Sequence, residues 1–282
     1  MVPGESSGVL VRLKDPIRRI AGQFGFEIRR RGTGHDSALA LGALFAETTS
    51  SPAECAASQR LLAGLSQFLA AGAIPRGQLL QDALAVGDSP EPGFFIEVGA
   101  GHPTELSNVA QLIDVFSWEG IRVDPNPEFA SLHRSTGQPN VTFCEVAVGE
   151  VDGASFDLVV AGELSSRVDL AKSDGHRGAR AKAVRAGQVV GVQVRRLDSL
   201  LSEIGVPDRV AYLSLDTEGS ELEVLRTVPF QSVDIDVITV EHNFRPGALY
   251  ELDRCLGALG FVRVLSRVSA WDAWYLHQRT FD

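Results

Sequence analysis

Acidic and polar residues recur at the ends of the apolar runs in this sequence. If those runs form parallel strands, their carboxyl ends meet at one edge of a sheet, where open α/β proteins bind ligands. Carboxylates there can accept hydrogen bonds from a sugar diol, take up protons or hold a divalent cation, and a histidine can exchange protons near neutral pH. The residues in these positions are Glu97, Asp124, Glu145, Asp216, Glu218, Glu241 and His242.

The first of these runs, Phe94–Val98, breaks into Gly99, Ala100 and Gly101, and a helix-like stretch from Thr104 to Trp118 follows. Glycines let a backbone approach a ligand closely, and a helix that begins there offers unpaired N–H groups. The pattern predicts a nucleotide-type cofactor at the turn. A tight turn without a ligand is the alternative.

Asp124 ends the next apolar run, 25 positions after Gly99. A carboxylate in this place can accept from both hydroxyls of a ribose, and capping of the following helix is the alternative. A ribose site suits a nicotinamide dinucleotide as well as S-adenosylmethionine. The turn has Thr104 where the dinucleotide fingerprint has its third glycine. Glu97, just before the turn, can instead meet the cationic amino-acid end of S-adenosylmethionine, which favours that cofactor.

Two segments of the chain carry a resemblance to a known family. Residues 94–127 contain the glycine turn, and residues 213–225 read Leu-Ser-Leu-Asp-Thr-Glu-Gly-Ser-Glu-Leu-Glu-Val-Leu. Together they resemble the FkbM family of S-adenosylmethionine-dependent methyltransferases, and the second segment is the more specific. Residues 197–201 and 240–243 also look like that family. The resemblance covers residues 90–280.

The resemblance implies a class I methyltransferase fold, which is a doubly wound, Rossmann-like α/β sheet of seven mostly parallel strands with a C-terminal antiparallel hairpin. It implies O-methyl transfer from S-adenosylmethionine to a hydroxyl of a sugar, glycolipid or secondary metabolite. By this match, the turn and Asp124 hold the cofactor, and Ala147 with its neighbours borders the adenine. His102 and Pro103 depart from the family pattern. The residues assigned to the cofactor are Glu97, Gly99, Ala100, Gly101, Asn108, Asp124, Pro125, Glu145, Val146, Ala147 and Asp216.

Methyl transfer to a hydroxyl requires alignment of two reactants and removal of the acceptor's proton. The candidate catalytic residues are His242, Asp216 and Glu241, with His242 as the preferred base. Alternatively, Asp216, Glu218 and Glu241 gather a divalent cation such as Mg²⁺, which prefers oxygen ligands. The competing structural roles are an ordinary hydrogen-bonding histidine at a strand end and carboxylates that cap the helix after residue 219.

Apolar runs and helical stretches alternate from residue 94 onward, which predicts βαβ units. The expected strands are 94–98, 121–123, 141–148, 156–160, 189–194, 210–215, 235–240, 261–265 and 273–277. The expected helices are 104–118, 127–135, 198–204, 220–226 and 248–259. The polar segment 162–187 interrupts the alternation. We interpret it as an acceptor-side lid, and a disordered insertion is the alternative.

The chain divides into residues 1–92, a basic arm with a helical segment, and residues 93–282, a cofactor-binding domain. Residues 1–31 hold seven basic and three acidic side chains. This arm either makes peripheral contact with an anionic membrane or a partner, or is solvated on the domain surface. Ser51 followed by Pro52 predicts the start of a helix.

The formal charge of −10 argues against nucleic acid as a partner. The three widely spaced cysteines form no disulfide framework or zinc motif, and no apolar run suits a transmembrane segment. With no signal-peptide pattern, a cytoplasmic location is expected. A small-molecule or glycan acceptor is expected, and a homo-oligomer is compatible with the sequence. The alternative functions are a nicotinamide-dependent oxidoreductase and a catalytically silent partner subunit.

Overall fold

The computed structural model describes residues 51–87, 91–170, 177–245 and 247–281. At its centre is a seven-stranded sheet with the order β10-β11-β9-β8-β1-β2-β3. Strand β11 runs antiparallel to β9 and β10, and the other neighbouring strands are parallel. The strands are β1 Phe94–Val98, β2 Glu119–Val123, β3 Val141–Cys144, β8 Arg209–Leu215, β9 Asp234–Glu241, β10 Phe261–Val264 and β11 Asp272–His277. The predicted doubly wound fold with a C-terminal hairpin is confirmed.

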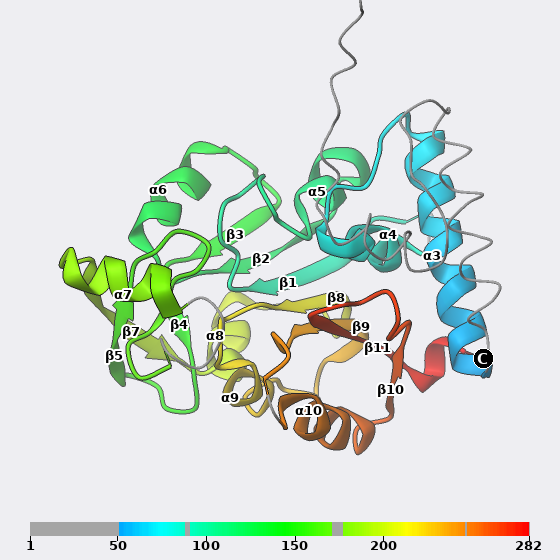
Figure 1. The fold of residues 1–282 in the computed structure, drawn as a ribbon. Helices are drawn as coiled ribbons and strands as arrows, with labels where there is room; N and C mark the ends of the chain where they lie inside the picture. The colour runs from blue at the N-terminus through cyan, green and yellow to red at the C-terminus, as the bar shows by residue number, and fades with distance from the viewer. Residues whose placement is uncertain (1–50, 88–90, 171–176, 246, 282) are drawn as a thin grey trace, which may run out of the picture.

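Helices cover both faces of this sheet (Figure 1). Successive side chains of a strand point to opposite faces, and accordingly Ile96 and Phe95 belong to different hydrophobic clusters. The Ile96 cluster contains α8 Leu197–Ile204, α9 Glu221–Leu225 and α10 Ala248–Gly257. The Phe95 cluster contains α3 Pro52–Ala70, α4 Gln81–Val86 and α5 Ala110–Phe116. Short 3-10 turns lie at Gln78–Leu80 and Gln278–Thr280, and α6 Pro127–Ser135 packs beside β3.

Helices α3 and α4 contact the sheet through hydrogen bonds as well as through apolar packing. Helix α3 begins as expected, because the Ser51 hydroxyl accepts from the Glu54 N–H at 3.2 Å. Gln81 of α4 accepts from the Tyr212 hydroxyl at 2.9 Å and donates to Asp272 at 2.6 Å. The basic arm lies outside the described residues, so its contacts and the boundary after residue 92 stay predictions.

A second, four-stranded sheet with the order β4-β7-β5-β6 is inserted between β3 and β8. Its strands are β4 Ala147–Val148, β5 Ser155–Val159, β6 Ser166–Arg167 and β7 Val189–Arg195, and α7 Arg177–Arg185 packs on it. The expected strand 141–148 is therefore wrong as one strand, because the chain leaves the first sheet after Cys144. Segment 162–187 contains β6 and α7, and residues 171–176 lie outside the described part.

The helix expected from Thr104 begins only at Ala110. The His102 Nδ1 accepts from the N–H groups of Thr104 and Glu105, and Leu106 has a positive φ of 62°. These local contacts hold a loop after the glycine turn, so no helix N-terminus lies directly at it. Among the described residues, no helix is long and apolar enough to cross a membrane.

Candidate functional site

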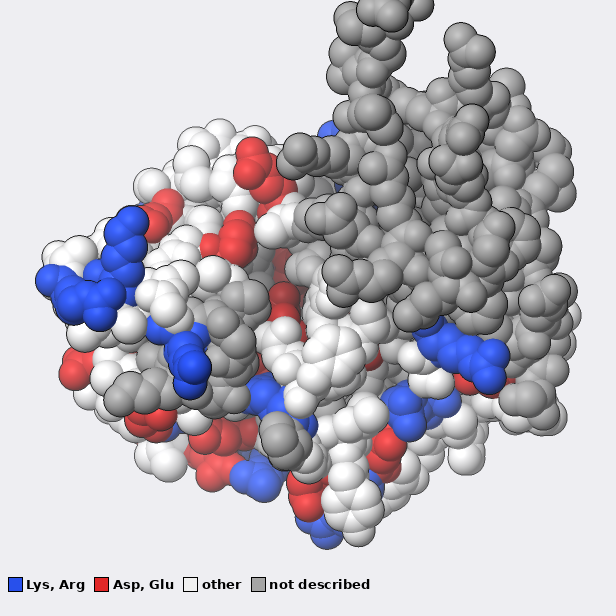
Figure 2. Space-filling model, viewed as in Figure 1, with Lys and Arg blue, Asp and Glu red and all other residues white. Residues whose placement is uncertain are grey.

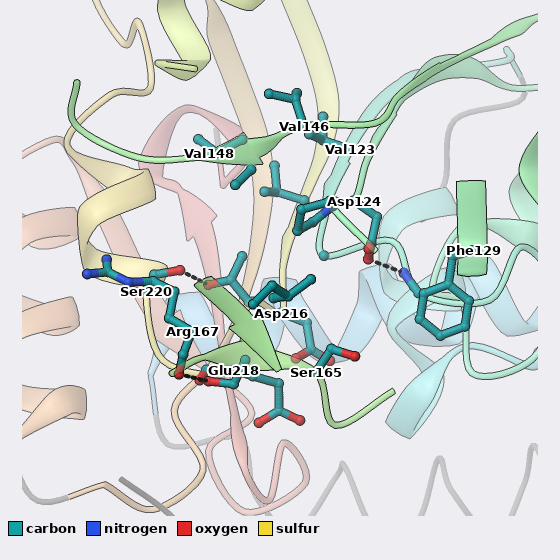
Figure 3. Close-up of a pocket in the computed structure, with 18 of the residues that line it drawn as sticks. Val123, Asp124, Phe129, Val146, Val148, Ser165, Arg167, Asp216, Glu218 and Ser220 are labelled. Carbon is teal, nitrogen blue, oxygen red and sulfur yellow. Dashed lines mark hydrogen bonds between the residues drawn. The ribbon is translucent and has the colours of Figure 1, made fainter. Parts of the chain in front are cut away.

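A cavity lies at the carboxyl ends of β1, β2 and β8, where the inserted sheet meets the first one (Figure 3). The cavity together with the open solvent at its mouth comprises about 660 Å³. Apolar side chains form one part of its wall: Val98, Val123, Pro125, Phe129, Val146, Ala147, Val148, Phe156 and Leu158. Carboxylates form another part: Asp124, Glu163, Asp216 and Glu218. Figure 2 shows acidic side chains in the hollow between the inserted sheet and the rest of the molecule.

The turn after β1 requires its glycines. Gly99 and Gly101 have φ of 80° and 54°, in the left-handed region that favours glycine. A Cβ on Gly99 would lie 1.7 Å from the Asp216 carbonyl oxygen, and one on Gly101 would lie 2.2 Å from Oε2 of Glu163. The buried Ala100 lies between them and does not line the cavity. The turn is thus packed closely against β8 and the inserted segment.

Asp124 is positioned by two backbone groups. One carboxylate oxygen accepts from the Gly101 N–H at 2.9 Å, and the other accepts from the Asn126 N–H at 2.8 Å. The cap of α6 is Asn126, which accepts from the Glu128 N–H, so the capping alternative for Asp124 is wrong. Burial raises the pKa of Asp124 to about 6. Its carboxylate lines the cavity with acceptor sites beyond these two bonds.

Glu97 does not line the cavity. Its carboxylate forms a buried ion pair with Arg122, with Nε and Oε2 3.1 Å apart, and accepts from the Asn108 N–H at 3.1 Å. Burial raises the pKa of Glu97 to about 7, although Arg122 opposes this. The Asn108 side chain donates to Ser214 and accepts from the Gln78 N–H, also away from the cavity. Both residues therefore fix the loop after the turn, and their direct contact with a cofactor stays a prediction.

The other residues assigned to the cofactor divide in the same way. Pro125, Val146 and Ala147 line the apolar part of the cavity. Glu145 is exposed and pairs with Arg134 at 2.8 Å on the surface. The sequence analysis did not indicate that Phe156 and Leu158 of the inserted strand β5 complete this wall.

Three carboxylates meet at the ends of β8 and β9, as expected. Oxygens of Asp216, Glu218 and Glu241 lie within 4.8 Å of one another. Glu241 is 7% exposed, and its Oε2 has no hydrogen-bond partner. Burial and the adjacent Asp216 raise the pKa of Glu241, and burial raises the pKa of Asp216 to about 6. Two carboxyl groups this close share a proton more readily than they both ionise.

The side chain of Glu221 holds the loop that follows Asp216. Glu221 accepts from the N–H groups of Thr217 and Gly219 at 3.1 and 2.9 Å, and it pairs with Arg245. Glu221 therefore satisfies two backbone donors of the loop ahead of α9, and the N-cap residue of α9 is Ser220, not Asp216.

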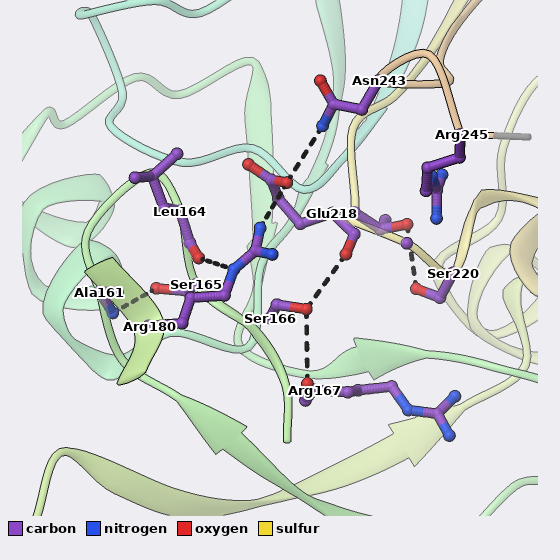
Figure 4. Close-up of polar contacts among 12 residues, drawn as sticks. Ala161, Leu164, Ser165, Ser166, Arg167, Arg180, Glu218, Ser220, Asn243 and Arg245 are labelled. Atoms are coloured by element: carbon purple, nitrogen blue, oxygen red, sulfur yellow. Dashed lines mark hydrogen bonds and ion pairs between the residues drawn. The ribbon is translucent and has the colours of Figure 1, made fainter. Parts of the chain in front are cut away.

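Glu218 is held by a buried arginine from the inserted segment (Figure 4). Arg180 of α7 is fully buried and lies 2.7 Å from Oε2 of Glu218, which also accepts from Asn243 at 3.3 Å. Arg180 donates to the Leu164 carbonyl at 2.8 Å as well. Sequence reasoning missed Arg180 and Glu163, because they lie in a polar segment without hydrophobic periodicity.

His242 lies beside the acidic cluster and outside the cavity lining. Its Nδ1 accepts from the Phe244 N–H at 3.1 Å, and burial lowers its pKa. This is the hydrogen-bonding role at a strand end that the sequence left open, and a base role for His242 stays a prediction. His133 of α6 is 6% exposed, and its Nε2 lies 2.9 Å from the Gly101 carbonyl oxygen.

Comparisons with known proteins place the chain in a family. No curated protein matches the sequence. Among solved structures, precorrin-6y C5,15-methyltransferase from Geobacter metallireducens GS-15 is similar, with 13% identity, a TM-score of 0.35, and coverage of 61% of this chain and 65% of that chain. We draw no conclusion from a likeness at that TM-score. The family model of the methyltransferase FkbM domain matches residues 97–263, more than half of the chain, and includes the glycine turn and the acidic strand ends. The chain therefore belongs to the FkbM methyltransferase family.

Proposed function

We propose that the protein is an S-adenosylmethionine-dependent O-methyltransferase. The observation that carries the proposal is the combination, in one cavity, of a positioned Asp124, an apolar wall and a set of carboxylates. Asp124 suits a ribose diol, the apolar wall suits a purine, and the carboxylates suit the positive charge of a sulfonium and an ammonium group. Family membership supports the same cofactor.

The charge of the cavity disfavours the oxidoreductase alternative. A nicotinamide dinucleotide carries a pyrophosphate, which would lie among like charges from Asp216, Glu163 and Glu218. Arg167 also lines the cavity, but its guanidinium pairs with Glu223 at 2.7 Å and Asp169 at 2.8 Å. No observation on the described residues favours a silent partner subunit.

The residues present fit the cofactor, which when bound supplies an electrophilic methyl group on a sulfonium. Asp124 would hold the ribose, and Val146, Ala147 and Val148 would contact the adenine. Asp216 lines the cavity and is the proposed base: its raised pKa, about 6, keeps it ionised near neutral pH yet able to accept the proton that an acceptor hydroxyl loses. Burial and Asp216 raise the pKa of Glu241, so Glu241 would hold the proton of this pair and leave Asp216 as its ionised member.

A divalent cation on Asp216, Glu218 and Glu241 is the alternative occupant of the same oxygens. Arg180 already supplies a positive charge to Glu218. We therefore favour a proton shared by Asp216 and Glu241 over a divalent cation at these oxygens. We expect the acceptor to be a hydroxyl of a sugar, glycolipid or secondary metabolite, because the family resemblance implies this class.

One screen tests the proposal and the cation together. Labelled methyl transfer from S-adenosylmethionine is measured against sugars, glycolipids and polyketides, with and without EDTA. We expect transfer to a hydroxyl-bearing acceptor that persists in EDTA. Loss of transfer in EDTA, restored by Mg²⁺, would favour the cation over the shared proton. Reduction of NAD(P)⁺ by the protein, with no methyl transfer, would overturn the proposal.

A further inference from the structure

The peptide group between Gly101 and His102 is held at both ends. Its carbonyl oxygen lies 2.9 Å from Nε2 of His133, and its N–H donates to Oε1 of Glu163 at 3.1 Å. The C=O and N–H of a trans peptide point in opposite directions. Gly101 and Glu163 line the cavity, whereas His133 does not. The N–H is therefore directed at the cavity wall, and the carbonyl is turned away from it.

Gly101 needs such contacts because its backbone rotates easily. Its φ of 54° lies in the left-handed region, and glycine adopts positive and negative φ about equally readily. The peptide before Gly101 is fixed by Asp124, which accepts from the Gly101 N–H at 2.9 Å. The peptide after Gly101 contacts His133 through its carbonyl. Asp124 and His133 thus hold the two peptide groups that flank this glycine.

The imidazole of His133 is suited to donate to the Gly101 carbonyl. His133 lies in the last turn of α6, is buried, and stacks on Phe143 of β3 with ring centroids 4.2 Å apart and 12° between the ring planes. Burial and, to a smaller extent, the charge of Arg122 lower the pKa of His133 to about 4. The ring is therefore neutral near pH 7 and has one N–H. Because a carbonyl oxygen can only accept, that proton belongs on Nε2.

We infer that His133 is a positioning residue for the cofactor: its neutral ring donates from Nε2 to the Gly101 carbonyl and thereby keeps the glycine turn in its binding conformation. The inference rests on the proposed function. His133 need not touch the cofactor, since it acts through the turn from outside the cavity lining. Without the donor, the carbonyl loses its partner and the peptide can rotate. A rotated peptide would direct the carbonyl oxygen at the carboxylate of Glu163.

Two substitutions separate the donor from the stacked ring. His133→Phe keeps an aromatic ring against Phe143 and removes the donor, whereas His133→Gln keeps a side-chain N–H near the place of Nε2 and removes the ring. The matched control is His277→Phe, because His277 packs on Phe261 with ring centroids 5.0 Å apart, at the end of β11 opposite the acidic cluster.

The first readout is the dissociation constant of S-adenosylhomocysteine, measured by calorimetry for the wild-type chain and each variant. We expect roughly tenfold weaker binding in His133→Phe and a change of about threefold or less in His133→Gln. The control should bind as the wild-type chain does. The second readout is nuclear magnetic resonance without ligand. The ring nitrogen signals of His133 should report a neutral imidazole with its proton on Nε2 near neutral pH, and the His102 amide signal should move in His133→Phe but not in the control.

Three results would overturn the inference. Equal affinity in the wild-type chain and His133→Phe would mean that the turn does not need the donor. Equal weakening in His133→Phe and His133→Gln would mean that His133 contributes only to packing. A ring proton on Nδ1 would mean that Nε2 does not donate to the Gly101 carbonyl. If the wild-type chain does not bind S-adenosylhomocysteine, the proposed function itself fails, and the inference fails with it.

Discussion

Replacement of Arg180 by methionine tests how the inserted segment is tied to the acidic strand ends. The substitution keeps most of the apolar stem but removes the buried charge that lies 2.7 Å from Glu218. Glu218 is 7% exposed, so the variant leaves a buried carboxylate without its guanidinium partner. Removing one member of a buried ion pair costs about 3–5 kcal/mol, a large share of a stability of about 5–15 kcal/mol. We expect a free energy of unfolding lower by that amount.

The assay is equilibrium unfolding in urea of the wild-type chain, Arg180→Met, Glu218→Gln and the double variant. The glutamine that Glu218→Gln introduces cannot be ionised, so the double variant is expected to recover at least half of the loss. The control is Arg177→Met, an exposed residue at the start of α7, with a change of about 0.5 kcal/mol or less. A loss below about 1 kcal/mol in Arg180→Met, or a double variant no more stable than the single one, would refute the buried-pair account.

Three further outcomes follow from the site. Asp216→Asn should lower the rate of methyl transfer about 10²–10⁴-fold in the labelled-transfer assay. The affinity for S-adenosylhomocysteine, measured by calorimetry, should change only a few-fold. An unchanged rate of transfer would exclude Asp216 as the base. Affinity for S-adenosylhomocysteine should rise from pH 5 to 7, because Asp124 and Asp216, both with a pKa of about 6, ionise over this range; a flat profile would contradict their role. Gly99→Ala should abolish binding of S-adenosylhomocysteine, because the new Cβ would lie 1.7 Å from the Asp216 carbonyl oxygen. Gly137 also has a positive φ, but open space surrounds it, so Gly137→Ala should cost only about 1–2 kcal/mol of stability.

The sheet could be predicted because its strands are buried on both faces. Such strands are continuous apolar runs, and the expected strand 94–98 coincides with β1 Phe94–Val98. The acids at the strand ends follow from the same pattern, since the chain turns polar where it leaves the core. Asp216, Glu218 and Glu241 therefore lie close together, and Asp124 lines the same cavity as Asp216 and Glu218.

The direction of individual side chains could not be predicted. The register of β1 and β2 places Glu97 opposite Arg122, and this pairing turns the carboxylate away from the cavity. The loop that replaces the first turns of the expected helix depends on hydrogen bonds to His102, a contact with no sequence signature. Arg180 and Glu163 reach the site only through the tertiary placement of the inserted sheet.

Direct titration of the cofactor tests the central claim. Calorimetry on the wild-type chain and Asp124→Ala, with S-adenosylhomocysteine and with NAD⁺ as separate ligands, reports which compound the cavity holds. We predict saturable binding of S-adenosylhomocysteine, clearly weaker in Asp124→Ala, and no binding of NAD⁺. Binding of NAD⁺ without S-adenosylhomocysteine, or S-adenosylhomocysteine affinity that does not depend on Asp124, would contradict the account.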